Sequence, residues 1–336
     1  MNRATARAKL ESLASLIDKS MQRSYLRMLK TVRDEVALAR AVRAIERGDV
    51  TGAVEAMLSG MGRATAGLRA SLESSFTQAA RSYMRTSLPA TLRTVFTPGS
   101  PAAATVFREL DLQLIGPITR SFEEGLRAAV TSGLLRGANP LAIAREARAS
   151  VGFTTYDVSL IEGFRLKLLS GDITGALASA LRDRRYDGTL RRARDGELTL
   201  TVDKISAMTE RYAQALESWR AETWSRTAAL QATRASQYAS WAQGAQDAGV
   251  DPHTMTKTWV ATLDDRVRDE HAEAHGITVP FDEPFPVDGG VMVPGENVYN
   301  CRCTMIVNVL PRNTRTAGSF ADVSRASRSE RFAEVA

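Results

Sequence analysis

Residues 201–248 read TVDKISAMTERYAQALESWRAETWSRTAALQATRASQYASWAQGAQDA, and this stretch decides the fold. It contains no proline, and Gly244 is its only glycine. Apolar side chains recur every three or four residues along its first part, which predicts one continuous helix with an apolar stripe: Val202, Ile205, Met208, Tyr212, Leu216 and Trp219. A helix of about 45 residues is roughly 70 Å long at 1.5 Å per residue. Because that length exceeds a single compact domain, the helix is expected to act as a strut or a coiled-coil stem.

A compact module is predicted directly after this helix, over residues 250–310. Residues 257–263 (KTWVATL) alternate polar and apolar side chains, and residues 303–310 (CTMIVNVL) give the clearest strand in the chain. Between them we expect a short helix ending at Gly276 and a long, irregular, proline-rich loop. All four tryptophans fall between the middle of the long helix and the start of this module, so aromatic packing is expected to join the two: Trp219, Trp224, Trp241 and Trp259.

The chain before residue 201 is predicted to be helical, with breaks at proline and glycine. The expected helices cover residues 2–48, about 62–94, 102–135, 140–150, 157–169 and 173–184, with kinks or breaks at Pro89 and Gly116-Pro117. Asn139-Pro140 is a typical helix start, because asparagine caps the first turn and proline fits the first helical position. Residues 183–200 (DRRYDGTLRRARDGELTL) are predicted to be a polar, basic loop.

One short motif occurs twice. GDVTGAVEAML at residues 48–58 resembles GDITGALASAL at residues 171–181, and in both an aspartate is placed to cap a short helix. The sequence leaves open whether a helical unit was duplicated or the same capping chemistry arose twice.

The predicted fold class is therefore mainly α, with an elongated helical N-terminal region, a long strut helix and a small α+β C-terminal module. The expected segments are a helical region at 1–97, a second helical region at 98–200, the long helix at 201–249, the module at 250–310 and a tail at 311–336. The first boundary follows from the turn-forming sequence Thr97-Pro98-Gly99-Ser100-Pro101. The tail has no apolar periodicity and is expected to be flexible.

Composition and charge limit the classes of function. No apolar run reaches the length of a membrane span, and no secretory signal is visible at the N-terminus. The two cysteines are spaced C-x-C and do not form a disulfide framework, which favours synthesis in a reducing compartment. Residues 251–310 are acidic, with ten Asp/Glu against four Lys/Arg, whereas residues 1–250 are basic, with 35 Lys/Arg against 25 Asp/Glu. The basic part indicates either a nucleic-acid or acidic partner, or simply a solvated, arginine-rich helical surface.

The module carries a motif that resembles the phage Mu F-like head morphogenesis proteins, the minor head proteins of tailed phages. The matching positions extend over about 55 residues: Trp259, Ala261, Asp264, Asp265, Arg266, His271, Gly276, Pro294 and the run Asn300-Cys301-Arg302-Cys303. The Ala/Arg/Thr-rich helix before the module is similar to the usual lead-in of this family. Some members carry a further cysteine and a further histidine, and this chain has Arg268 and Val298 at those positions.

The resemblance implies a structural, non-enzymatic protein of the virion, made in the host cytoplasm and located in the head interior or at the portal vertex. It would act in head morphogenesis through assembly, DNA packaging or ejection. The expected partners are the portal protein and, as further candidates, the major capsid or scaffold protein, without membrane contact. No cofactor is expected unless zinc is bound. The alternative is a zinc-binding hydrolase or toxin-like effector carried by a phage.

A zinc site is one hypothesis for the module. His271 and His275 are four residues apart, so on a helix both rings would project from one face. Cys301 and Cys303 alternate along a strand and share a side, so two imidazoles and two thiolates would make a tetrahedral set. The competing interpretation is that these side chains only pack and hydrogen-bond in a small core.

Two further functional hypotheses remain. A cysteine beside a histidine is a nucleophile–base pair, which Asp264 or Asp265 could orient, although a structural role in a turn or an ion pair with Arg266 or Arg302 suits these aspartates better. Non-specific contact with double-stranded DNA is the second hypothesis, and its candidate residues are Arg182, Arg184, Arg185, Arg191, Arg192 and Arg194. No aromatic residues are interleaved with these arginines in the pattern of a single-strand-binding surface.

Overall fold

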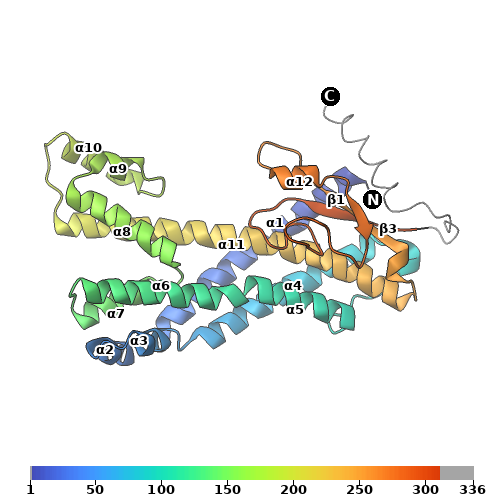
Figure 1. The fold of residues 1–336 in the computed structure, drawn as a ribbon, viewed down its shortest axis with the longest axis horizontal. Helices are drawn as coiled ribbons and strands as arrows, with labels where there is room; N and C mark the ends of the chain where they lie inside the picture. Colours follow the sequence, from blue (N-terminus) through green and yellow to red (C-terminus); the bar gives the residue numbers. More distant parts are fainter. Residues whose placement is uncertain (1, 311–336) are drawn as a thin grey trace. The chain divides into compact units, whose positions relative to one another are not determined.

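The computed structural model describes residues 2–310, which are mainly helical and contain a three-stranded antiparallel sheet near their C-terminal end (Figure 1). The helices are α1 (Arg3–Asp34), α2 (Leu38–Glu46), α3 (Val50–Met57), α4 (Met61–Thr86), α5 (Pro101–Leu114), α6 (Gly116–Leu135), α7 (Pro140–Ala149), α8 (Thr155–Ser170), α9 (Ile173–Ala178), α10 (Asp187–Arg194), α11 (Val202–Asp247) and α12 (Asp269–Glu273). The strands are β1 (Met255–Val260), β2 (Thr278–Pro280) and β3 (Thr304–Val309). The predicted fold class, mainly α with a small α+β module, is confirmed.

The chain divides into two compact units, each assembled from separate stretches of sequence. Of the described residues, the first unit contains 2–24, Leu68–Leu114 and 223–310, and the second contains Tyr25–Gly67 and Ile115–Glu222. Helices α1, α4 and α11 therefore each contribute residues to both units. This grouping differs from the linear segments expected from the sequence. The tail predicted at 311–336 lies outside the described residues.

The 46-residue helix α11 confirms the predicted long helix, but its second half is not a solvated strut. Every residue from 227 to 237 is buried, which makes this part the central core helix of the first unit. Small alanine, serine and threonine side chains allow neighbouring segments to approach closely. The hydroxyls of Ser236 and Ser240 donate to the carbonyls of Phe76 and Ala80 at 2.8 and 2.9 Å, so the buried polar groups keep partners. A periodicity count cannot distinguish such a helix from an exposed stem, because small residues and buried polar residues such as Arg234 and Gln237 leave no continuous apolar stripe in this part.

The sheet confirms the two predicted strands and lies in the first unit, along the C-terminal part of α11 (Figure 1). Its strand order is β2-β1-β3, with Trp259 opposite Met305 in the antiparallel β1–β3 pair. β1 is buried at nearly every position, and both Trp259 and Val260 have no exposed surface. The central strand therefore cannot alternate between core and solvent as a half-buried strand would.

Local capping explains the helix boundaries that the sequence predicted correctly. Asn139 caps α7 through the amide of Leu141, with Pro140 at the first helical position. The two aspartates of the repeated motif, Asp49 and Asp172, both accept a hydrogen bond from the third following amide. The second motif and the first thus share their capping chemistry. At the sites predicted to be kinks, α4 ends at Thr86 before Pro89, and α5 gives way to α6 at Gly116.

The predicted loop at 183–200 is wrong for its first half, because residues 184–194 form a 3-10 turn followed by α10. Leu190 is 1% exposed and packs in a small core of the second unit together with Phe164, Ile205 and Tyr212. This buried leucine, with Tyr186 and Ala193 packed against the same core, fixes one face of α10. The helix predicted at 173–184 is correspondingly shorter, since α9 ends at Ala178.

Hydropathy adds one negative finding for the described part of the chain. None of its helices combines the length and the apolar character needed to cross a lipid bilayer.

Candidate functional site

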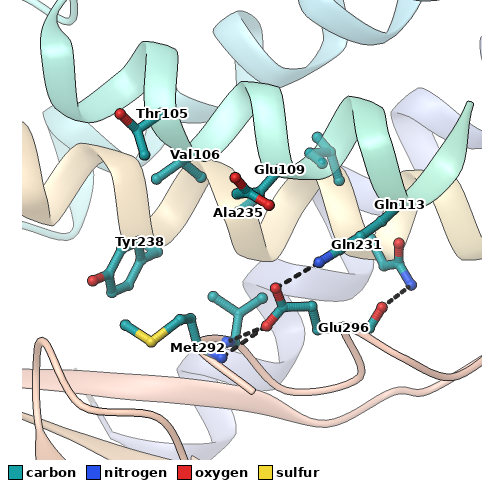
Figure 2. Close-up of a pocket in the computed structure, with 11 residues that line it drawn as sticks. Thr105, Val106, Glu109, Gln113, Gln231, Ala235, Tyr238, Met292 and Glu296 are labelled. Carbon is teal, nitrogen blue, oxygen red and sulfur yellow. Dashed lines mark hydrogen bonds between the residues drawn. The ribbon is translucent and has the colours of Figure 1, made fainter. Parts of the chain in front are cut away.

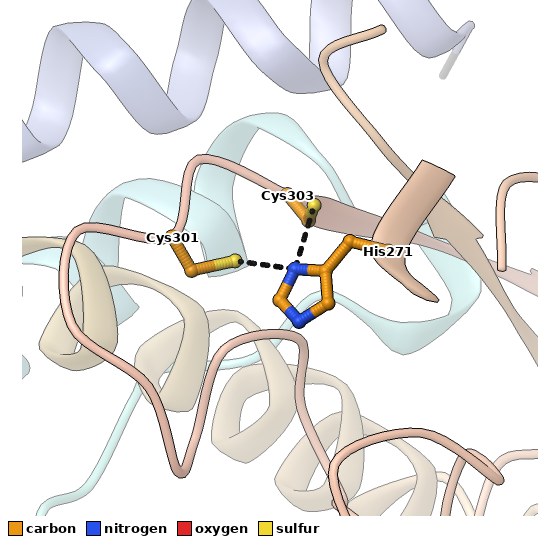
Figure 3. Close-up of side chains that lie close together, drawn as sticks. All are labelled: His271, Cys301 and Cys303. Carbon is orange, nitrogen blue, oxygen red and sulfur yellow. Dashed lines mark hydrogen bonds between the residues drawn. The ribbon is translucent and has the colours of Figure 1, made fainter. Parts of the chain in front are cut away.

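His271, Cys301 and Cys303 come together in the module, although 30 residues of chain separate the histidine from the first cysteine (Figure 3). The Nδ1 atom of His271 lies 3.5 Å from the Sγ of Cys301 and 3.5 Å from the Sγ of Cys303. All three side chains are buried, with at most 3% of their surface exposed. The histidine comes from α12 and the cysteines from the segment that leads into β3.

Asp288 orients the histidine from its other side. The Nε2 atom of His271 lies 2.9 Å from Oδ2 of Asp288. Asp288 has a left-handed backbone (φ 53°), and its amide donates to a carboxylate oxygen of Glu270 at 3.0 Å. The side-chain amide of Asn297 donates to the Asp288 carbonyl at 3.1 Å. These contacts hold the loop in place, and the ring is thereby fixed with Nδ1 toward the two sulfurs.

Arg234 of α11 holds the cysteine segment from the opposite side. Its side chain has no exposed surface, and Nη1 donates to the carbonyls of Cys301 and Cys303 at 2.9 Å each. Gln237, one turn further along α11, donates to the carbonyl of Met305 at 2.9 Å. Residues on one face of the core helix thus bind the backbone of the C-x-C segment directly.

The electrostatic environment treats the two cysteines differently. A hydrogen bond from Cys303, the contact with His271 and the nearby Arg234 guanidinium lower the pKa of Cys301. The same shared hydrogen bond, together with burial, raises the pKa of Cys303. Contact with Cys301, and to a smaller extent with Asp288, raises the pKa of His271. The cluster therefore favours ionisation of Cys301 over ionisation of Cys303, and the charged form of the imidazole more than in a free histidine.

His275 does not join this cluster, which corrects the expected four-ligand set. The expectation rested on a helix that carries both histidines, but α12 ends at Glu273. The ring of His275 instead lies against the backbone after β1, where its Nδ1 accepts a hydrogen bond from the amide of Ala261 at 3.1 Å. Three of the four predicted ligands are therefore brought together: His271, Cys301 and Cys303.

The other motif residues have structural contacts. Arg302 forms a bidentate ion pair with Asp264 at 2.5 and 2.6 Å, which lowers the pKa of this aspartate. Asp264 also accepts from the amide of Arg266, so it closes a turn as the structural interpretation predicted. Asp265 and the side chain of Arg266 are exposed. An aspartate does orient His271, but it is Asp288 and neither of the two suggested by the sequence.

Three more motif positions shape the backbone of the module. Gly276 and Asn300 have left-handed backbones, with φ of 85° and 55°. The backbone amide of Asn300 donates to the hydroxyl oxygen of Thr227 on α11 at 3.1 Å. Trp259 packs edge-on against His271, with ring centroids 5.2 Å apart. These residues set the position of the cluster and provide none of its ligand atoms.

Lys257, at the centre of β1, is a buried cation that sequence reasoning missed. It has no exposed surface, and Nζ donates to the carbonyl of Met292 at 2.8 Å. The same nitrogen lies 5.2 Å from the ring centroid of Tyr238 and 5.0 Å from that of Phe285. Burial lowers the pKa of Lys257 to about 7, and the carboxylate of Glu296 offsets part of the shift. Such a lysine is close to half-charged at neutral pH.

This lowered pKa gives a testable pH dependence of stability. An unfolded lysine keeps its proton up to about pH 10, so the unfolded state binds more protons than the folded state above pH 7. The free energy of unfolding is therefore expected to rise between pH 7 and 10, by at most about 1.4 kcal/mol per pH unit. Lys257→Met should remove this rise, and Lys204→Met, at an exposed position of α11, should keep it. Urea unfolding across this pH range measures the difference, and parallel curves for the wild type and Lys257→Met would contradict the assignment.

A cavity of about 220 Å³ opens in the first unit between α5, α11 and the loop at 292–296 (Figure 2). Val106, Leu110 and Val293 give it an apolar lining, and Tyr238 lies at one end. Glu296 borders the cavity, but its carboxylate is already bound, since it accepts from the side chain of Gln113 and the amide of Met292 at 2.7 Å each. Glu109, on the exposed face of α5, is the other carboxylate of the lining.

Five of the six arginines proposed for DNA contact are engaged in ion pairs with neighbouring acids. Their partners all lie between residues 183 and 197: Arg182 and Arg191 pair with Asp187, Arg185 with Asp183, Arg192 with Glu197 and Arg194 with Asp195. Across the described residues, Arg184 alone of this set has no ion pair. The segment therefore has less unpaired positive charge available for DNA phosphates than its sequence suggested.

The functional residues that sequence reasoning missed are Arg234 and Asp288. Arg234 interrupts a run of alanine, serine and threonine in the middle of α11, and a charged residue on an otherwise small-residue helix was the available signal. Asp288 precedes two glycines in the irregular loop, where an aspartate most often marks a turn. No local pattern indicates that its side chain reaches His271.

Comparison with known proteins gives one match. A family model described as "Phage Mu protein F like protein" matches residues 124–306, which is more than half of the 336-residue chain. The matched range includes all of α11, the sheet up to β3 and the complete His271–Cys301–Cys303 cluster. Neither the curated proteins nor the solved structures contain a match. The chain belongs to the phage Mu protein F-like family.

Proposed function

We propose that this protein is a minor structural component of a tailed-phage head and acts near the portal vertex, in assembly, DNA packaging or ejection. The observation that carries the proposal is the family match over residues 124–306, because this family is one of phage head morphogenesis. Residues of the motif also stabilise the fold, since Asp264 pairs with Arg302 and the carbonyls of Cys301 and Cys303 accept hydrogen bonds from Arg234. A structural role is consistent with a motif of this kind.

The hydrolase alternative has one favourable feature, since Cys301, His271 and Asp288 lie in the order of a nucleophile, a base and an orienting acid. However, the two cysteines are 1% and 3% exposed, and neither lines the cavity described above. A nucleophile must meet its substrate at about 3 Å, which a sealed core prevents. The burial of the sulfurs therefore favours the structural proposal over catalysis.

The cavity beside α5 is the contact site that we propose for the portal protein. Its apolar lining suits an aliphatic or aromatic anchor, and such anchors in pockets supply most of the binding energy of protein interfaces. Glu109, at the exposed side of the cavity, suits a lysine or arginine next to that anchor. A portal segment with one apolar residue beside a basic residue would complement both features.

Filling the cavity tests this proposal. Thr105 is exposed and lines the cavity, so Thr105→Trp is expected to place an indole into its mouth without disturbing the core. The affinity for the portal protein should fall at least about tenfold, in a co-purification or titration assay. Ala104→Trp, at an exposed neighbouring position outside the lining, is the matched control and should bind like the wild type.

The possible outcomes distinguish the role at the portal vertex from the cavity as the contact site. A wild-type protein that does not bind its portal at all would contradict the portal-vertex role. If the wild type binds and both tryptophan variants bind equally well, the role stands and the cavity is not the contact site. Portal cross-links that map to other residues would support that second result.

A further inference from the structure

We propose that His271, Cys301 and Cys303 bind a divalent thiophilic ion of the Zn²⁺ class, with Asp288 orienting the histidine and one coordination position left for a non-protein ligand. The proposal is independent of the head-assembly role, since it concerns the chemistry of a single buried cluster. It replaces the four-ligand set suggested by the sequence with three ligands and a supporting carboxylate.

The spacing of the ligand atoms fits a tetrahedral ion. With Zn–N of about 2.05 Å and Zn–S of about 2.3 Å, tetrahedral geometry puts the nitrogen and each sulfur about 3.6 Å apart. The Nδ1 atom of His271 lies 3.5 Å from both sulfurs. All three ligand atoms lie within 4.8 Å of one another, so both thiols can face one ion together with the ring nitrogen.

The second nitrogen of the ring supports the same assignment. Metal-bound histidines commonly donate their other N–H to a carboxylate, which fixes the tautomer and the ring orientation. At 2.9 Å from Asp288, Nε2 has this partner, and the neutral ring then presents the lone pair of Nδ1 to the sulfurs. Asp288 is itself held by Glu270 and Asn297, so the arrangement does not depend on a mobile side chain.

The buried charges favour a divalent ion. Arg234 is fully buried, and among the described residues it forms no ion pair with a carboxylate. A bound site would hold this guanidinium, the Asp288 carboxylate, two thiolates and the ion. With a dication, the net charge of these groups is zero. A monovalent ion such as Cu⁺ would leave one uncompensated negative charge in the core, and burying an unpaired charge is costly. Zn²⁺ accepts this mixture of sulfur and nitrogen ligands, and Mg²⁺ or Ca²⁺ would prefer oxygen.

The ligand count leaves one position open. Among the described residues, the group of close histidine, cysteine and acidic side chains contains three members. The side chain of Arg268, next to the start of α12, provides no ligand atom and donates to the carbonyl of Tyr299 at 2.9 Å. Three protein ligands with water in the fourth position is the arrangement of catalytic zinc sites, but here the burial of all three side chains keeps substrates away from the ion. Here the ion would tie α12 to the segment before β3.

The site is tested on the full-length protein, purified under reducing conditions, stripped of metal and reloaded with Zn²⁺. Elemental analysis after removal of free ion is expected to give about one equivalent of zinc per chain. Co²⁺ in place of zinc should give thiolate-to-cobalt charge-transfer absorption and the ligand-field bands of a tetrahedral site. This spectrum requires no variant, so it remains informative even if substitutions in the core prevent folding.

Variants assign the ligands, and the module contains a matched control. Cys301→Ser, Cys303→Ser and His271→Asn are expected to lose zinc, and Asp288→Asn should weaken binding by about 10- to 100-fold, measured by competition with a chromophoric chelator. A second histidine–aspartate pair, His253 with Asp282 at 3.1 Å, lies on the exposed surface of the same module. His253→Asn and Asp282→Asn should bind zinc like the wild type.

Each contrary result overturns a specific part of the proposal. Less than about 0.1 equivalent of zinc after loading, with no cobalt–thiolate band, would show that the cluster is only a packed core. Retention of Cu⁺ without retention of Zn²⁺ would overturn the charge argument. Loss of zinc in the His253 or Asp282 variants would place the ion elsewhere. None of these results bears on binding to the portal protein, so the two proposals fail separately.

Discussion

Replacing Arg234 with methionine is expected to lower the free energy of unfolding of the first unit by about 3 kcal/mol or more. Arg234 is fully buried and donates to the carbonyls of Cys301 and Cys303. Methionine fills part of the volume but offers no donor, so two buried carbonyls lose their partner. Leaving a buried acceptor unsatisfied costs about 1–3 kcal/mol for each group. The expected loss is therefore a large fraction of the stability of an ordinary domain.

The experiment for Arg234 is denaturant unfolding of the metal-free protein, combined with hydrogen exchange of the backbone amides. Arg226→Met is the matched control, because Arg226 lies on the same helix but is exposed. We expect the control to change stability by less than about 0.5 kcal/mol. Faster exchange in β3 and in the cysteine segment should accompany the Arg234 substitution. Equal stability of the two variants would mean that the buried guanidinium contributes no net hydrogen-bond energy.

The features that the sequence predicted correctly are those determined by neighbouring residues. The long helix α11, the cap at Asn139 and the strand β3 each follow from a pattern within a few turns of chain. The motif also identified both cysteines of the cluster and its histidine. For the helix and the cap, local chemistry was sufficient because their hydrogen bonds are closed within the element or its first turn. Strand β3 was indicated by its run of apolar residues, although its hydrogen bonds are made to the distant strand β1.

The features that could not be predicted from the sequence depend on contacts between distant residues. Arg234 binds carbonyls 67 and 69 positions away, and Asp288 lies 17 positions from His271. His275 was placed on a helical face because the end of α12 at Glu273 is not marked by a strong stop signal. Helix α10 was predicted as a loop because one buried leucine, Leu190, outweighs the polar residues around it. In each case the tertiary environment decided the outcome.

Asp157 carries the second large effect, and its replacement by alanine is expected to destabilise the second unit by about 3–5 kcal/mol. This carboxylate is 2% exposed and accepts three hydrogen bonds on Oδ2, from the amide and hydroxyl of Thr154 at 2.8 and 2.7 Å and from Arg220 at 2.6 Å. Alanine removes the capping box of α8 and leaves a largely buried guanidinium without its counter-ion. The arginine must then be desolvated without compensation, which accounts for most of the expected loss.

An exposed cap in the same unit separates the two contributions to the Asp157 effect. Asp172 caps α9 through the amide of Gly175 at 2.9 Å, but it has no ion pair among the described residues and its side chain is exposed. Asp172→Ala is therefore expected to cost about 1 kcal/mol, the usual value for a lost cap. Urea unfolding of both variants measures the two decreases in the free energy of unfolding, and hydrogen exchange assigns each decrease to its helix.

If Asp157→Ala lowers the free energy of unfolding no more than Asp172→Ala does, the buried ion pair with Arg220 adds no stability beyond that of the cap. The double variant Asp157→Ala/Arg220→Met then decides the cause, because removing both charges should recover part of the loss if an uncompensated guanidinium produced it.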